Sequence, residues 1–78
     1  MTKLTPLTPK ALIKILIKLG FSDVRSKGSH HFFFNAKTNK TTVVPIHGNE
    51  TIGIGLLKEI LRDIELPTEE YECLRREM

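Results

Sequence analysis

Two adjacent histidines, His30 and His31, stand in a segment that could do chemistry on a phosphate backbone. They follow a turn signal at Lys27-Gly28, and the segment also carries two cationic residues, Arg25 and Lys27, upstream of the histidines. Imidazole has an unperturbed pKa of about 6.5, so it gives and takes protons near neutral pH. Guanidinium and ammonium groups bind phosphate oxygens. The segment therefore indicates either acid/base chemistry on a nucleic acid or binding to one.

Cleavage of RNA without a metal needs three kinds of group. A base takes the 2′-hydroxyl proton, an acid protonates the departing 5′-oxygen, and cations stabilise the charge that builds up around phosphorus. His30 could act as the base or the acid. If a tight turn at Lys27-Gly28 joins two strands in simple register, Arg25 lies across from His30 and brings a guanidinium to the same place.

His47 is a possible acid/base partner for His30. A hairpin centred near Thr38 pairs residues whose numbers add up to about 76, which places His30 opposite Ile46 and close to His47. A slip of one residue would turn a side chain to the other face of the sheet. The alternative is that His47 is a loop histidine with structural or peripheral contacts.

Strand alternation divides the aromatic run into two sets. Phe32 and Phe34 share the side of His30, whereas His31 and Phe33 point the other way. The pattern does not decide which set faces the helices. We expect at least two of the three phenylalanines to pack in the core, and an exposed one could stack on a base or lie under a protein partner.

The charge of the chain is unevenly distributed. Residues 1–48 hold eight Lys and Arg against one Asp, a net charge of +7, whereas residues 49–78 hold four against eight acids, a net charge of −4. Such asymmetry favours a protein that approaches an anionic polymer with one surface, although solvated lysines are the alternative. The candidate RNA or phosphate contacts are Lys14, Lys18, Arg25, Lys27, Ser29 and His31.

Length and composition predict one small globular domain in a reducing compartment. The 78 residues suffice for one core, and the single Cys73 cannot form an internal disulfide. No apolar run approaches the roughly 20 residues that a membrane span needs. We expect a cytoplasmic protein that does not contact membranes. A metal site at the histidines is not expected, because adjacent strand residues point apart and no carboxylate accompanies them at ligand spacing.

Helix and turn signals predict the order α-β-β-β-α-α. Thr8-Pro9 starts a helix that Gly20 ends. Three antiparallel strands follow at 21–26, 29–35 and 41–46, with Pro45 restricted to an edge or a strand end. Asn49 or Thr51 could cap the second helix, and a third opens at Pro67 and runs to about residue 76. The expected buried stripe of the second helix comprises Ile54, Leu57, Ile60, Leu61 and Ile64.

This order resembles the double-stranded RNA-binding-domain type of α+β fold, in which helices cover one face of a three-stranded antiparallel sheet. Four local motifs are more specific, and together they look like the HicA (YcfA-like) family of toxins from type II toxin-antitoxin systems. The resemblance covers about residues 8–66 of a single domain, 1–78, and leaves 67–78 as a short C-terminal helix. The motifs are Leu19-Gly20-Phe21, Arg25-x-x-Gly28-Ser29-His30-His31, Val44-Pro45-Ile46-His47-Gly48-Asn49 and Gly55-Leu56-Leu57-x-x-Ile60-Leu61.

The resemblance implies an mRNA interferase, an endoribonuclease that cuts mRNA without a metal or other cofactor and is neutralised by a HicB-type antitoxin. It implies that His30 is the catalytic histidine, because the family places it directly after Gly-Ser, and that His31 is supporting. The chain departs from the common pattern at Leu56, where many members have Thr, and in its extension beyond Leu66.

Two other classes of function fit the residues. A non-catalytic RNA-binding module would use the same fold and basic surface, and its RNA binding would survive loss of His30. A protein-interaction subunit would bind a partner through its acidic terminal helices. Its affinity for RNA would be weak and would depend little on salt, because it would release few counterions.

Overall fold

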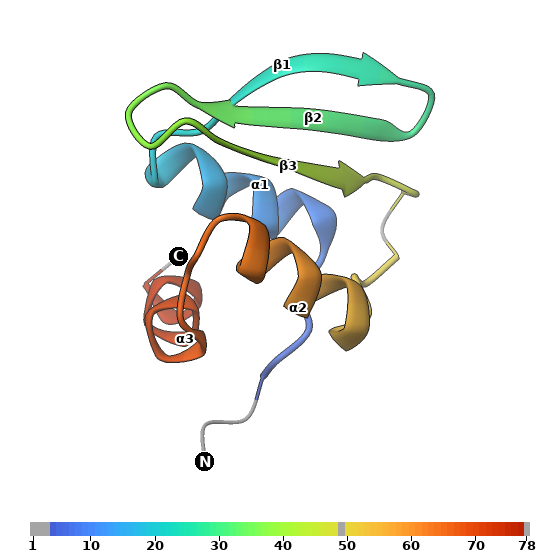
Figure 1. Cartoon of the computed structure of the whole chain (residues 1–78). Helices are drawn as coiled ribbons and strands as arrows, with labels where there is room; N and C mark the ends of the chain where they lie inside the picture. The colour runs from blue at the N-terminus through green and yellow to red at the C-terminus, as the bar shows by residue number, and fades with distance from the viewer. Residues whose placement is uncertain (1–3, 49, 78) are drawn as a thin grey trace.

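The computed structural model describes residues 4–48 and 50–77. Over these residues the elements are α1 (Pro9–Lys18), β1 (Ser22–Lys27), β2 (His30–Asn35), β3 (Lys40–Pro45), α2 (Ile54–Asp63) and α3 (Thr68–Arg76). The strands form one antiparallel sheet in the order β1-β2-β3. The helices lie on one side of this sheet, and its other face is open (Figure 1). The predicted α+β fold and its order of elements are confirmed.

Helix α1 begins and ends at the residues that the sequence signals predict. The Oγ1 atom of Thr8 accepts a hydrogen bond from the N–H of Ala11 at 3.2 Å, and Pro9 is the first helical residue. Proline suits this position because its missing N–H would have no partner inside the helix. Just past the helix, Gly20 has a φ of 103°, a left-handed value that favours glycine. The chain then leaves α1 and enters β1.

The turn between β1 and β2 lies one residue later than predicted. Lys27 pairs with His30, so the turn consists of Gly28 and Ser29 rather than Lys27 and Gly28. Gly28 takes a φ of 60°, which a glycine adopts freely at the first position of a two-residue hairpin turn. Consequently β1 ends at Lys27, not at Ser26.

The turn between β2 and β3 sets the register of the second hairpin. The N–H of Asn39 donates to the carbonyl of Asn35 at 2.7 Å, and Asn39 has a φ of 59°. Lys40 pairs with Asn35 and Pro45 pairs with His30. Pro45 is the last residue of an edge strand, where its missing N–H removes no inner ladder bond, so its predicted position is confirmed.

The core lies between the helices and one face of the sheet, which we call the inner face. Of the three consecutive phenylalanines only Phe33 belongs to it, with 1% of its surface exposed. The expectation that at least two would be buried is wrong, because the open face takes the other two. The largest fully buried side chains are Leu12, Ile15, Leu16, Phe33, Val44, Leu57, Ile60 and Tyr71.

Helix α2 departs from the prediction at its first turn. Its N-cap is Gly53, with no capping side chain, so the predicted cap at Thr51 is wrong. The alternative cap, Asn49, lies outside the described residues. Ile54 is 42% exposed and does not join the buried stripe, because helical side chains lean toward the preceding turn and Ile54 has none. The rest of that stripe is buried as predicted: Leu57, Ile60, Leu61 and Ile64.

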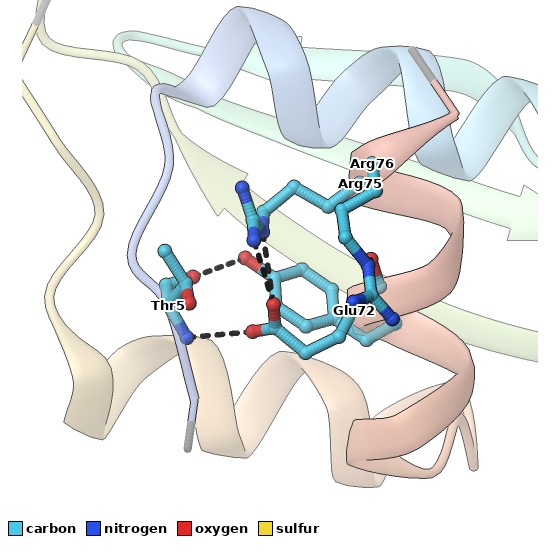
Figure 2. Close-up of polar contacts among 5 residues, drawn as sticks. Thr5, Glu72, Arg75 and Arg76 are labelled. Atoms are coloured by element: carbon cyan, nitrogen blue, oxygen red, sulfur yellow. Dashed lines mark hydrogen bonds and ion pairs between the residues drawn. The ribbon is translucent and has the colours of Figure 1, made fainter. Parts of the chain in front are cut away.

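The N-terminal segment is fastened to α3. The N–H of Thr5 donates to Oε2 of Glu72 at 2.8 Å, and the hydroxyl of the buried Tyr71 donates to the Thr5 carbonyl. Arg75 donates to Oε1 of Glu72 at 2.8 Å, and Figure 2 shows this cluster. The segment around Thr5 is therefore joined to α3, 66 residues later in the sequence, by hydrogen bonds on the helical side of the core.

Candidate active site on the outer face of the sheet

Strand register assigns each strand residue to one face of the sheet. Phe33 and Asn35 on β2 are buried against the helices, so their neighbours in sequence point to the opposite side, which we call the outer face. Residues directly opposite each other on paired strands share a face. The outer face therefore comprises Ser22, Arg25, Lys27, His30, Phe32, Phe34, Thr41, Val43 and Pro45.

His30 is exposed at the start of β2, between Lys27 on β1 and Pro45 on β3. The prediction that Arg25 lies across from His30 is wrong, because the turn takes Gly28 and Ser29 and moves the register by two. Lys27 takes that place. A primary ammonium group, rather than a guanidinium, is thus the nearest cross-strand cation to the imidazole.

Arg25 pairs with Phe32 instead. Its guanidinium carbon lies 5.8 Å from the centre of the Phe32 ring, within the range of a cation–π contact. Arg25 therefore lies on the same face as His30, one cross-strand step further along the sheet than Lys27. The outer face combines an imidazole, two cations and aromatic rings.

A β-bulge at Val24 separates two charges that simple alternation would place together. Asp23 pairs with Phe33 and Arg25 pairs with Phe32, so Val24 is the extra residue. In a regular strand Asp23 and Arg25 would point to one side, whereas here Asp23 belongs to the inner face. The bulge was not predicted, because the succession Asp23-Val24-Arg25 gives only a weak sequence signal for it.

His31 faces away from His30, as strand alternation predicts. Its Nδ1 atom lies 2.9 Å from Oδ2 of Asp23, and both side chains are partly exposed. The two histidines therefore do not act together on one reacting group. His31 links β2 to β1 through Asp23.

His47 lies in the loop after β3, exposed, at the end of the sheet that carries His30. The predicted pairing of His30 with Ile46 is wrong by one residue. The N–H of Ile46 donates to the carbonyl of Ser29 at 2.7 Å, and this bond closes the sheet one position beyond the pairing of His30 with Pro45. Among the described residues no hydrogen bond joins the imidazoles of His30 and His47. His47 instead lines a hollow at the start of α2.

The lysines of α1 belong to the helical side of the molecule. Lys14 and Lys18 are both exposed, and Lys18 Nζ lies 3.9 Å from Oε1 of Glu77. The sheet separates α1 from the outer face (Figure 1). The structure therefore brings Arg25, Lys27 and His30 together on one face and leaves these two lysines on another layer.

Within residues 4–48 and 50–77, no group of three or more His, Cys, Asp or Glu side chains is arranged to hold a metal ion. None of the helices there combines the length and apolar character required to cross a bilayer.

The fold and the outer face define a small α+β protein with an exposed histidine on an open, basic and aromatic sheet. Residues 9–66 match the family model described as HicA toxin of bacterial toxin-antitoxin. The chain belongs to that family. No curated protein matches the sequence. The matched range ends before α3, so the contacts between α3 and Thr5 lie outside it.

Proposed function

We propose that this toxin is a metal-independent endoribonuclease that cleaves mRNA, with His30 as its catalytic acid or base. The observation that carries the proposal is the position of His30. It is exposed on an open face, directly opposite Lys27 and on the same side as Arg25. A phosphodiester laid across this face would meet a proton-transfer group and two cations at once.

The reaction would use the RNA's own 2′-hydroxyl as the nucleophile. His30 would take the hydroxyl proton while the 2′-oxygen attacks phosphorus, or it would protonate the 5′-oxygen as the bond from phosphorus to that oxygen breaks. The products of such a step are a 2′,3′-cyclic phosphate and a 5′-hydroxyl end. Lys27 and Arg25 would offset the negative charge that grows on the non-bridging oxygens.

The remaining candidates take secondary roles in this proposal. His47 could supply the second proton transfer, because it lies two residues after Pro45, and Pro45 pairs with His30. Ser29 forms the turn that carries His30, and His31 supports the site by tying β2 to Asp23. Lys14 and Lys18 would contact only those parts of an RNA that extend around the molecule.

The proposed biological setting follows from membership of a toxin-antitoxin family. The substrate would be cytoplasmic mRNA, and a HicB-type antitoxin would neutralise the toxin. An antitoxin that covered the exposed His30 would block the reaction directly.

Induced expression in a bacterial host tests the proposal. The wild type should arrest growth and degrade mRNA, and purified protein should cleave RNA in the presence of a chelator. His30→Ala should lower the cleavage rate by about a hundredfold or more, since general acid–base groups contribute roughly that much. His47→Ala, made in parallel, shows whether a second imidazole takes part. Cleavage by folded His30→Ala at the wild-type rate would exclude the proposed role. RNA binding without any cleavage by the wild type would indicate a binding module instead.

A further inference from the structure

We propose that the outer face binds a single-stranded stretch of RNA, with bases stacked on Phe34 and Phe32 and the backbone held along β1 by Arg25 and Lys27. This inference rests on the proposed function, because it names the form of RNA that would reach His30. It predicts that cleavage requires unpaired nucleotides beside the scissile phosphate.

Two aromatic side chains are presented in line with His30. Phe32 and Phe34 are both partly exposed and occupy alternate positions of the central strand. Alternate residues of a strand are about 7 Å apart, so the two rings and the imidazole form a row about 13 Å long. No helix covers this row (Figure 1). Phenylalanine rings left open on a sheet are suited to stacking on bases.

The charge of the outer face complements a nucleic acid. The residues of the three strands include one carboxylate, Asp23, and the bulge at Val24 places it on the inner face with His31. Arg25 and Lys27 remain on the outer face without an acidic neighbour from any strand. Removing the carboxylate from the face with the two cations would not strengthen the binding of a neutral protein surface. It would strengthen the binding of a phosphate backbone.

Arg25 is placed to contact both a base and the phosphate backbone of a bound RNA. Its guanidinium lies over the Phe32 ring, and the side chain is exposed. A guanidinium plane can stack on a base while its N–H groups reach phosphate oxygens. Phe34 is partly exposed, like Phe32, and Arg25 does not lie over its ring. We therefore assign the stronger stacking contact to Phe34.

The arrangement favours single strands over duplexes. In an A-form helix the bases are stacked on one another, so an aromatic ring cannot reach their faces. A strand whose bases are splayed out can lay them on Phe32 and Phe34 while its phosphates follow β1. A duplex could contact only the cations.

The experiment measures binding in a His30→Ala background, which keeps the RNA intact. Fluorescence anisotropy follows a short labelled RNA of mixed sequence, either single-stranded or folded as a hairpin of the same composition. Phe34→Leu should weaken binding of the single strand by about tenfold, and Phe34→Tyr should keep it within about twofold, because tyrosine retains the stacking face. Ile17→Ala is the matched control, since Ile17 is an exposed apolar residue on α1.

Salt dependence tests the backbone contacts separately. Arg25→Gln and Lys27→Gln should each reduce the slope of log K against log salt by about 0.7, the value for one phosphate contact on a single strand. Lys58→Gln, an exposed lysine on α2, should leave the slope unchanged.

Three results would overturn the inference, and none of them depends on whether His30 is catalytic. The first is equal binding of the hairpin and the single strand. The second is unchanged binding by folded Phe32→Leu and Phe34→Leu. The third is that these variants lose affinity only for the antitoxin, which would make the outer face a protein interface. If single-stranded RNA binds as described but the otherwise unmodified protein does not cleave it, the proposed function fails and the binding face stands.

Discussion

Lys27 and His30 face each other across the β1–β2 hairpin, with only Gly28 and Ser29 between them in sequence. Directly opposed residues have Cβ atoms about 5 Å apart, so a phosphate that contacts the imidazole is within reach of the Lys27 ammonium group. This relationship distinguishes Lys27 from the other lysines of the chain and underlies the first prediction.

Lys27→Gln should lower kcat/KM for RNA cleavage by about tenfold, because it removes a cation next to the transition-state charge. Lys27→Arg should retain most of the activity, since it keeps the charge. Lys58→Gln on α2 removes the same charge far along the chain from His30 and serves as the control. A kcat/KM equal to that of the wild type in Lys27→Gln would show that the pairing has no catalytic role.

The Thr8 cap should contribute measurably to the stability of α1. Thr8→Ala removes the acceptor for the Ala11 N–H and should lower the free energy of unfolding by about 1 kcal/mol in urea denaturation. Thr38→Ala, in the exposed turn between β2 and β3, is the matched control and should change it little. Equal losses for the two variants would contradict a specific capping contribution.

Tyr71 is the single tyrosine of the chain, so its ionisation can be followed directly by ultraviolet absorbance. Burial, reinforced by the neighbouring Glu72 carboxylate, raises the pKa of Tyr71 from 10.0 to about 12. The folded protein should therefore titrate near pH 12, and the protein unfolded in urea near pH 10. Because the folded pKa is the higher one, this stabilisation is complete below pH 10 and is lost as the pH rises through about 12. A midpoint near pH 10 in the folded state would place the phenol in solvent.

Glu72 should make stability depend on pH at the acidic end. Burial alone would raise the pKa of Glu72, but the hydrogen bonds from Arg75 and the Thr5 N–H outweigh it and lower this pKa below 4.5. The stabilisation is therefore present above pH 4.5 and is lost as the pH falls through the lower, folded value.

Glu72→Gln should consequently cost about 2 kcal/mol at pH 7 and much less at acidic pH. Urea denaturation at both pH values measures the difference. Glu70→Gln, an exposed residue of the same helix, is the control. A cost that does not change with pH would show that the charge of Glu72 contributes nothing.

Local signals in the sequence were sufficient to predict the order of the helices and strands and the two ends of α1. The two ends of α1 are set by Thr8, Pro9 and Gly20. These ends were predictable because helix capping and a left-handed backbone are properties of single residues. Pro45 ends β3 for the same kind of reason. The order of helices and strands and most of the buried stripe of α2 also followed from the spacing of apolar residues.

The composition of the site did not follow from such signals. His30 was identified from its neighbours in sequence, but its cross-strand partner was predicted as Arg25 and is Lys27. A hairpin turn moved by a single residue changes every pairing along the two strands, and nothing local fixes which two residues form the turn. The bulge at Val24 likewise depends on the partner strand.

The sequence by itself determined the order of the elements, and it pointed to His30 as the histidine for the proposed chemistry. Only the tertiary structure decided which face of the sheet is open and which side chains share it with His30. The physical reason is that side chains alternate along a strand, so either set of aromatic residues could have been buried. Packing of the helices against Phe33 and Val44 settled that choice and left Phe32, Phe34 and His30 facing outward.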